Sequence, residues 1–355
     1  MKKIKVLSLV LSSIIFLTFF TGCAGKKIIS QAELDTPQNA YNQGMELLNK
    51  GDYLKAVSMF DRSIGLDKKF AYAYLGKGIA YLHIGDYKKA EKNVKKMISL
   101  DKKNPQGYVA YGRVNNAKGE LNKALNMFEK ALDLDTETKE AYFYMGETFE
   151  MAEENDEAKK QYKSAIEIDA YYNDAIKALE KLQKREIAMT GMDSEYVAIA
   201  NKDAVTRADC AALLVEDFKV EKYLRKTDKV MLPTDSEMHW AKGYIEKVLA
   251  VGAMEEYSDR SFKPDEKITR VEFAMLLEKL IIKATGEEDL ATKFVGSVSP
   301  YSDVPNTHFA FNAIMVVTSR NIMESKGDGT FGAAKIVTGT DAILALKKLK
   351  VVLEQ

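Results

Sequence analysis

Residues 71–101 read AYAYLGKGIAYLHIGDYKKAEKNVKKMISLD, and residues 105–135 repeat the pattern 34 positions later as PQGYVAYGRVNNAKGELNKALNMFEKALDLD. Small residues, large apolar residues and a closing Leu-Asp pair recur at matching positions. A fixed period is interpreted before any other feature because it decides the architecture of the chain. The period extends over four copies, and the residues that keep the step are Gly44, Gly78, Gly112 and Gly146, then Ala56, Ala90, Ala124 and Ala158, then Phe60, Val94, Phe128 and Tyr162.

Each period predicts two helices that pack closely against each other. Small residues recur where the helices approach, and large residues fill the space between them. Turn signals such as Lys50-Gly51-Asp52 and Lys118-Gly119-Glu120 separate the two helices. The fourth copy has Glu153-Glu154-Asn155-Asp156 at this place, with no glycine. One helix pair cannot bury its apolar face, whereas four stacked pairs can.

Residues 37–170 resemble four tetratricopeptide repeats, a family with a period of about 34 residues. The resemblance implies a right-handed superhelix whose concave wall binds a peptide or a partner protein. Residues 171–189 are expected to form the helix that caps the array. The wall lacks the Lys and Asn clamp with which some members bind a carboxylate, so chaperone-tail peptides are not expected. The residues expected to line the wall are Tyr41, Met45, Tyr72, Leu75, Ile79, Val109, Arg113, Asn116, Phe143 and Glu147. Packing between repeats is the alternative for the apolar residues of this set.

A processing signal precedes the repeats. Three lysines at positions 2, 3 and 5 are followed by mostly apolar residues 6–20, a run shorter than the roughly 20 residues of a membrane-spanning helix. The run ends in Phe20-Thr21-Gly22-Cys23, which resembles the lipobox of bacterial lipoproteins. The resemblance implies a signal peptide at residues 1–22, a lipid on Cys23 and a spacer over residues 23–36. An ordinary secretory signal with an incidental cysteine is the alternative.

Lipidation would place the protein in the cell envelope, anchored to a membrane by its lipid. The membrane would be the outer membrane, with the protein facing the periplasm, because Ala24 carries no aspartate retention mark. In a bacterium with one membrane it would be the outer face of the plasma membrane.

A second, longer period begins after about residue 190. The run Val205-Thr206-Arg207-Ala208-Asp209 recurs as Ile268-Thr269-Arg270-Val271-Glu272 and as Val337-Thr338-Gly339-Thr340-Asp341, at long and nearly equal intervals. His239-Trp240 recurs as His308-Phe309. Together these runs resemble S-layer homology repeats. The module would cover residues 190–355, with a partial first repeat and further repeats at about 233–281 and 301–350.

The Thr-Arg-x-Glu run has a physical meaning of its own. Thr269 and Glu272 have the spacing of a capping box at a helix N-terminus. Such an N-terminus attracts anions, and Arg270 would add a forked donor for a carboxylate or phosphate. In the family this arginine helps to bind anionic cell-wall polysaccharide. The residues carried over by motif are Arg207, Arg270, Thr269 and Glu272, with Trp240 as a sugar-stacking or groove-lining aromatic.

Alternatives stay open for these residues. Each arginine could instead be a structural cap with a surface ion pair, and Trp240 could belong to the core. The third repeat has Gly339 and Phe309 in place of the arginine and the tryptophan, so its groove is expected to be weak. The interval from Trp240 to Thr269, counted back from Thr206, leads to Lys177. We therefore hypothesise that one helix caps the array and also begins the three-repeat module, which would make the joint stiff.

Composition narrows the class of function. The 355 residues carry a net charge of zero, and no basic run is interleaved with aromatic residues, so nucleic acid is not an expected partner. No catalytic or metal-binding motif is present, and no cofactor is expected. Cys210 lies in an apolar stretch and is expected to be a small buried hydrophobe.

The sequence therefore predicts a non-enzymatic, mainly all-α protein of two repeat modules. One hypothesis is an envelope tether, with a lipid at one end, an anionic wall polymer at the other and an unknown protein or peptide in the repeat groove. The other hypothesis is an adaptor or assembly lipoprotein in which the second module is only structural.

Overall fold

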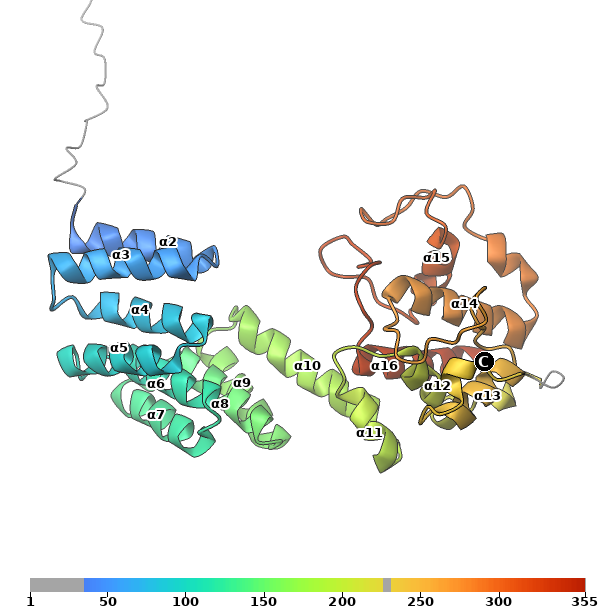
Figure 1. The fold of residues 1–355 in the computed structure, drawn as a ribbon, viewed down its shortest axis with the longest axis horizontal. Coiled ribbons are helices and arrows are strands. Elements are labelled where there is room, and N and C mark those ends of the chain that lie inside the picture. Colours follow the sequence, from blue (N-terminus) through green and yellow to red (C-terminus); the bar gives the residue numbers. More distant parts are fainter. Residues whose placement is uncertain (1–34, 226–230, 355) are drawn as a thin grey trace, which may run out of the picture. The chain divides into compact units, whose positions relative to one another are not determined.

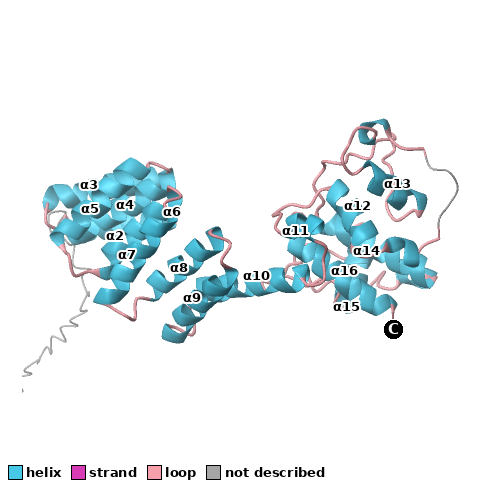
Figure 2. Ribbon diagram, turned by 90° about the horizontal axis from the view of Figure 1, so that it is seen from below, coloured by secondary structure: helices cyan, strands magenta, loops and turns pink. Residues whose placement is uncertain are grey.

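The computed structural model describes residues 35–225 and 231–354 (Figure 1). These residues form two compact units that divide between Thr148 and Phe149. Within the described residues the regular structure is helical, with two isolated β-bridges and no strand (Figure 2). The prediction of an all-α fold is confirmed. Cys23 and the segment expected to be the signal peptide lie outside the described residues. None of the described helices combines the length and apolarity that crossing a bilayer requires.

The first unit contains the helix pairs that the period predicted. Every copy of the repeat supplies one helix before its turn and one after it. The helices are α2 (Pro37–Asn49), α3 (Tyr53–Leu66), α4 (Ala71–Ile84), α5 (Tyr87–Leu100), α6 (Pro105–Ala117), α7 (Leu121–Leu134) and α8 (Lys139–Met151), the last of which contains the boundary between the units.

The repeated glycines mark the closest approach within each pair. A Cβ added to Gly112 would lie 2.3 Å from Cε1 of Phe128, and one added to Gly44 would lie 2.6 Å from Cε1 of Phe60. Both phenylalanine rings are fully buried. Since a real Cβ does not come this close to another carbon, the glycines allow the large residues of the second helices to pack against the first.

The turn between the two helices needs a left-handed residue. Gly51, Gly85 and Gly119 have φ values of 79°, 85° and 73°. Glu153 stands one further period along, has a φ of 62° and is exposed. The fourth turn therefore has the same backbone conformation without the residue that adopts it most easily.

The second unit begins with the end of the fourth repeat and continues into the three-repeat module. Helix α10 packs against both α9 and α16. The helices are α9 (Asn155–Ile168), α10 (Asn173–Met189), α11 (Ser194–Ala200), α12 (Arg207–Glu216), α13 (Lys242–Ala250), α14 (Arg270–Thr285), α15 (Phe311–Ser319) and α16 (Gly339–Leu353), and short 3-10 helices lie between some of them.

Contacts in the module follow a cycle. Helix α12 packs against α13, α14 against α15, and α16 against α10 and α11. A connection of similar length leads from the end of α10 to Thr206, from the end of α13 to Thr269 and from the end of α15 to Thr338. Helix α10 thus occupies the place of a first helix while also packing against α9. That the joint is stiff stays a prediction.

A closed ring of backbone hydrogen bonds joins the three repeats. The N–H of Ile268 donates to the carbonyl of Val205 (2.9 Å), that of Val337 to Ile268 (3.0 Å), and that of Val205 to Val337 (2.9 Å). All three side chains are buried. These residues immediately precede the three helix-capping threonines, so the ring brings the equivalent helix starts together.

Candidate functional site

Threonines cap α12, α14 and α16, and the cap that the sequence predicted at Thr269 is confirmed. Thr269 accepts from the N–H of Glu272, and the Glu272 carboxylate accepts from the N–H of Thr269 at 2.8 Å. Thr206 and Asp209 form the same capping box in the first repeat. Thr338 caps the third helix by accepting from the N–H of Asp341.

Arg270 connects the second repeat to the third. Its Nε donates to the carbonyl of Phe331 (2.9 Å), and its Nη2 donates to the carbonyl of Glu324 (2.6 Å). The guanidinium lies over the Phe331 ring, 4.6 Å from its centroid, and the residue is only 4% exposed. Burial lowers the pKa of Arg270, while the nearby Asp341 opposes this effect. Arg270 therefore has a structural role, but through hydrogen bonds to backbone carbonyls and not through the surface ion pair that the alternative included. Contact of Arg270 with a wall polymer stays a prediction.

Arg207 forms the same contacts one repeat earlier. Its Nε donates to the carbonyl of Phe262 and its Nη2 to the carbonyl of Glu255, both at 2.7 Å. Its guanidinium lies 4.6 Å from the ring centroid of Tyr257 and 4.5 Å from that of Phe262. Arg207 is only partly buried, so it stays closer to solvent than Arg270.

Two aspartates that were not among the expected site residues hold the turns in place. Asp303 accepts from the N–H groups of Phe331 (2.8 Å), Gly332 (2.8 Å) and Ala333 (2.9 Å). Asp235 accepts in the same way from Phe262 and Lys263. The signal in the sequence was the recurrence of an aspartate at the opening of each of these two repeats.

These hydrogen bonds change the pKa of Asp303. Partial burial alone would raise the pKa, but the backbone N–H groups of Ala333, Phe331 and Gly332 outweigh burial and lower it. The carboxylate form is therefore the one that the folded turn stabilises.

Two equivalent grooves lie beside the arginines. The first is a cavity of about 350 Å³ lined by Arg207, Glu255 and Lys279 among others. The second, of about 250 Å³, is lined by Arg270, Glu324 and Lys348 at the corresponding positions. Each contains a glutamate–lysine ion pair, Glu255 with Lys279 and Glu324 with Lys348 (2.9 Å). The fold therefore builds the same groove twice.

The two grooves differ in charge. Three basic and three acidic side chains line the first groove. Four basic and two acidic side chains line the second, where Lys184 of α10 and Lys326 add positive charge. Lys348 and then Lys184 lower the pKa of Glu324 to about 2. An anionic ligand is consequently favoured in the second groove over the first.

Trp240 is exposed rather than part of the core, so the core alternative is wrong. Its exposed fraction is 59%, and that of the equivalent Phe309 is 78%. In each case the preceding histidine contacts the residue just before the helix, since Nδ1 of His239 accepts from the N–H of Ala241 (3.1 Å) and Nδ1 of His308 from that of Ala310 (3.2 Å). Each histidine ring also lies beside the exposed aromatic ring, with centroids 5.6 Å apart for His239 and Trp240 and 4.5 Å apart for His308 and Phe309.

Gly339 is required by the packing of the first repeat. A Cβ at this position would lie 1.7 Å from the carbonyl oxygen of Ile199, at the end of α11. The N–H of Gly339 donates to the carbonyl of Lys202 at 2.8 Å, and Thr340 donates to Ala200. Helix α11 therefore takes the space that the turn and arginine occupy at the other two junctions.

The residues expected to line the wall of the repeat array differ in burial. Arg113 lies over the Tyr144 ring at 4.6 Å, and Asn116 donates to Thr148 at 2.7 Å. Tyr72 is 44% exposed. The partly buried residues are Tyr41, Met45, Ile79, Arg113 and Glu147. The buried ones are Leu75, Val109, Asn116 and Phe143, and these contribute packing whether or not a partner is bound.

No three side chains of the metal-binding types converge within residues 35–225 and 231–354. Cys210 is buried in the core of the second unit, where burial raises the pKa of its thiol. The Cys210 thiol therefore has no access to solvent and lacks the surroundings of a reactive cysteine.

Models of two known families match this chain. The S-layer homology domain matches residues 234–274 and 300–352. Tetratricopeptide repeat models match residues 41–105 and 105–138. The chain therefore carries tetratricopeptide repeats followed by S-layer homology domains. Both families are scaffold or anchoring modules, not catalytic ones.

Two proteins of Acetivibrio thermocellus are similar to part of the chain. Cell surface glycoprotein 1 is 25% identical over 145 residues, which are 41% of this chain and 6% of that protein. Cellulosome-anchoring protein is 30% identical over 112 residues, which are 31% of this chain and 23% of that protein. The matches span less than a quarter of the length of either relative.

Solved structures are also similar to part of the chain. MamA from Desulfovibrio magneticus has 25% identity and a TM-score of 0.33, and the match covers 38% of this chain and 77% of that one. A thermophilic TPR protein of Thermus thermophilus has 20% identity and a TM-score of 0.40, with 51% and 91% covered.

Proposed function

We propose that this protein is a non-enzymatic envelope protein that binds an anionic cell-wall polymer through its S-layer homology module and a protein partner through its tetratricopeptide repeats. The observation that supports the proposal is the second groove, a cavity with an excess of basic side chains whose lining lies mostly within the residues matched to the S-layer homology domain. The exposed Trp240 and Phe309 rings give the same module two surfaces on which a sugar can stack. The similarity to a Cellulosome-anchoring protein supports an anchoring role.

The assignment of polymer contacts follows the geometry of the grooves. Lys326 and Lys348 line the second groove and can present ammonium groups to carboxylates or phosphates. Arg270 stabilises the wall of this groove because its hydrogen bond to the Phe331 carbonyl holds that turn in place. Arg207 is only partly buried and lines the first groove, so it would contact a ligand there while holding its own turn. Thr269 and Glu272 form the capping box that fixes the start of α14.

Sedimentation with purified sacculi tests the proposal. The full-length protein should pellet with sacculi that retain their acidic polymer and stay in the supernatant with sacculi from which the polymer has been stripped by acid. The Lys326→Gln/Lys348→Gln variant should pellet less. The matched control, Lys267→Gln/Lys279→Gln, removes the same charge from the electrically balanced first groove and should change binding less. If the wild-type protein stays in the supernatant with both preparations, wall binding is refuted and the adaptor role is favoured.

A lipid on Cys23 would hold the other end of the protein at a membrane. We propose the periplasmic face of the outer membrane, or the outer face of the plasma membrane where there is only one. Two or more acyl chains give stable anchoring, since each buried methylene contributes about 0.8 kcal/mol. The expected result is that the wild type partitions into detergent and Cys23→Ser does not. Equal partitioning of both would refute lipidation.

The partner of the repeat array would contact the residues that the fold leaves accessible. Tyr72, with 44% of its surface exposed, and the partly buried Arg113 and Glu147 provide one aromatic and two opposite charged groups. Crosslinking from membranes followed by identification of the bound protein tests this part of the proposal. A Tyr72→Ala/Arg113→Ala variant should lose the crosslinked product, and retention of the same product would refute the assignment.

A further inference from the structure

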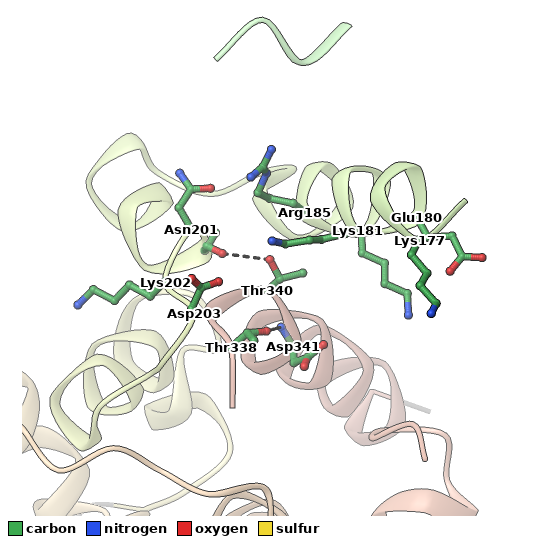
Figure 3. A pocket seen from close by; sticks show the side chains of 12 residues that line it. Lys177, Glu180, Lys181, Arg185, Asn201, Lys202, Asp203, Thr338, Thr340 and Asp341 are labelled. Carbon is green, nitrogen blue, oxygen red and sulfur yellow. Dashed lines mark hydrogen bonds between the residues drawn. The ribbon is translucent and has the colours of Figure 1, made fainter. Parts of the chain in front are cut away.

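A third cavity adjoins the second groove and extends it onto α10. Its volume is about 310 Å³, and it lies between α10, the end of α11 and the start of α16 (Figure 3). Lys184 and Asp341 line both this cavity and the second groove, so the two are continuous. Figure 3 shows Lys177 and Lys181 extending from α10, and Thr338 and Asp341 at the start of α16.

The combined surface has a strong excess of positive charge. Eight basic and four acidic side chains line the two cavities together, in a chain whose net charge is zero. The first groove, which has the same architecture, has equal numbers of both. Positive charge is therefore concentrated where α10 meets α16, and not at every junction of the module.

Three lysines form a row along α10. Lys177, Lys181 and Lys184 have the i, i+4, i+7 spacing that places side chains on one face of a helix. Lys184 already contacts Glu324 (3.2 Å), whereas Lys177 and Lys181 are exposed and form no ion pair with any described residue. The free ammonium groups are thus those farthest along the row from the second groove.

The groove itself contains like charges close together. Burial and the Arg270 guanidinium lower the pKa of Lys326, and Lys335 and Lys184 add to this effect although Asp341 opposes it. Bringing a negative charge to this place would relieve the mutual repulsion of the cations.

We infer that an anionic wall polysaccharide bound in the second groove continues across the start of α16 onto the lysine row of α10. This inference rests on the proposed function and adds a contact site on α10. An extended path suits a polymer with repeated charges better than a single small anion, because successive cations lie about one helical turn apart. The polymer would then contact the helix that packs against the last helix of the repeat array.

Sedimentation of the full-length protein with sacculi tests the inference through Lys177→Gln/Lys181→Gln. The matched control is Lys88→Gln/Lys92→Gln, which removes two exposed lysines at the same spacing from α5. The α10 variant should bind sacculi roughly tenfold more weakly, since two exposed ion pairs each contribute a factor of about three. The control should bind like the wild type, and the difference between the two variants should shrink at high salt.

The outcomes separate the inference from the proposed function. If the wild type binds polymer-bearing sacculi and the α10 variant binds them equally well, the path onto α10 is refuted and the proposed function stands. If the wild type does not bind, the proposed function itself is refuted. If the α10 variant loses binding to phosphatidylglycerol vesicles and keeps binding to sacculi, the lysine row faces a membrane and the inference is wrong. Unchanged Trp240 emission verifies that the variant is folded.

Discussion

Replacing Arg270 by alanine should unfold the second unit more readily, instead of merely weakening polymer binding. The substitution removes two hydrogen bonds from a charged donor to the carbonyls of Phe331 and Glu324 and leaves both carbonyls without this partner. Hydrogen bonds to charged groups contribute about 1.5–3 kcal/mol each, so the loss should be about 3–6 kcal/mol. For a unit of this size, each kcal/mol lowers the melting temperature by about 2–4 °C, so the expected fall is about 6–24 °C.

The single tryptophan makes this measurement specific. Trp240 lies in the second unit, so its fluorescence reports the unfolding of that unit even when the repeats of the first unit remain folded. Arg270→Lys keeps the charge but loses the fork, and should destabilise less. Arg207→Ala should also cost less, because Arg207 is less buried. If Arg270→Ala melted like the wild type and only lost binding to sacculi, the structural interpretation of its contacts would be refuted.

Three further predictions concern single positions. The first concerns Asp303, whose pKa is lowered in the folded protein. The stability that its carboxylate contributes is present above the unfolded pKa of about 3.9 and is lost as the pH falls below that value. The acid-induced drop in melting temperature should therefore be smaller in Asp303→Asn. Glu153→Gly should stabilise the protein by about 0.5–1 kcal/mol in urea unfolding. The left-handed backbone costs an L-residue about 1–2 kcal/mol, and the greater conformational entropy that glycine loses on folding offsets part of this gain. A lower urea midpoint would contradict this prediction. Gly112→Ala should destabilise the protein by about 1–3 kcal/mol because the added methyl group collides with Phe128. Gly65 has open space around it, so Gly65→Ala should stabilise by about 0.5–1 kcal/mol. The changes in unfolding free energy, followed by circular dichroism of the first unit, should have opposite signs, and equal signs would refute the packing argument.

Local pattern was sufficient to predict the helices and their starts. The fixed period predicted the helix pairs, and small residues such as Gly112 stand where a large residue such as Phe128 packs. Thr269 and Glu272 form the capping box that their spacing predicted. These features depend on residues within one or two helical turns, or on one repeat and its own turn, so the sequence contains them directly.

Contacts between repeats could not be deduced in this way. The carbonyls that Arg270 contacts are 54 and 61 residues away, and backbone carbonyls have no signature in the sequence. The motif suggested a ligand for this arginine, and its contacts with these backbone carbonyls could not be read from the motif. The substitution of arginine by Gly339 was visible in the sequence. Its cause, the carbonyl of Ile199, depends on the short helix α11, which among the described residues has no counterpart in the other two repeats.

The hydrogen-bonded ring of Val205, Ile268 and Val337 distinguishes the second module from the array of helix pairs that precedes it. An open array of helix pairs can gain or lose a copy at its end and keep the rest intact. A ring of three has no end: removing one member leaves the other two each with a broken bond and an uncovered apolar face. The number of copies in the second module is thus locked at three, while the first module is free to lengthen or shorten in evolution.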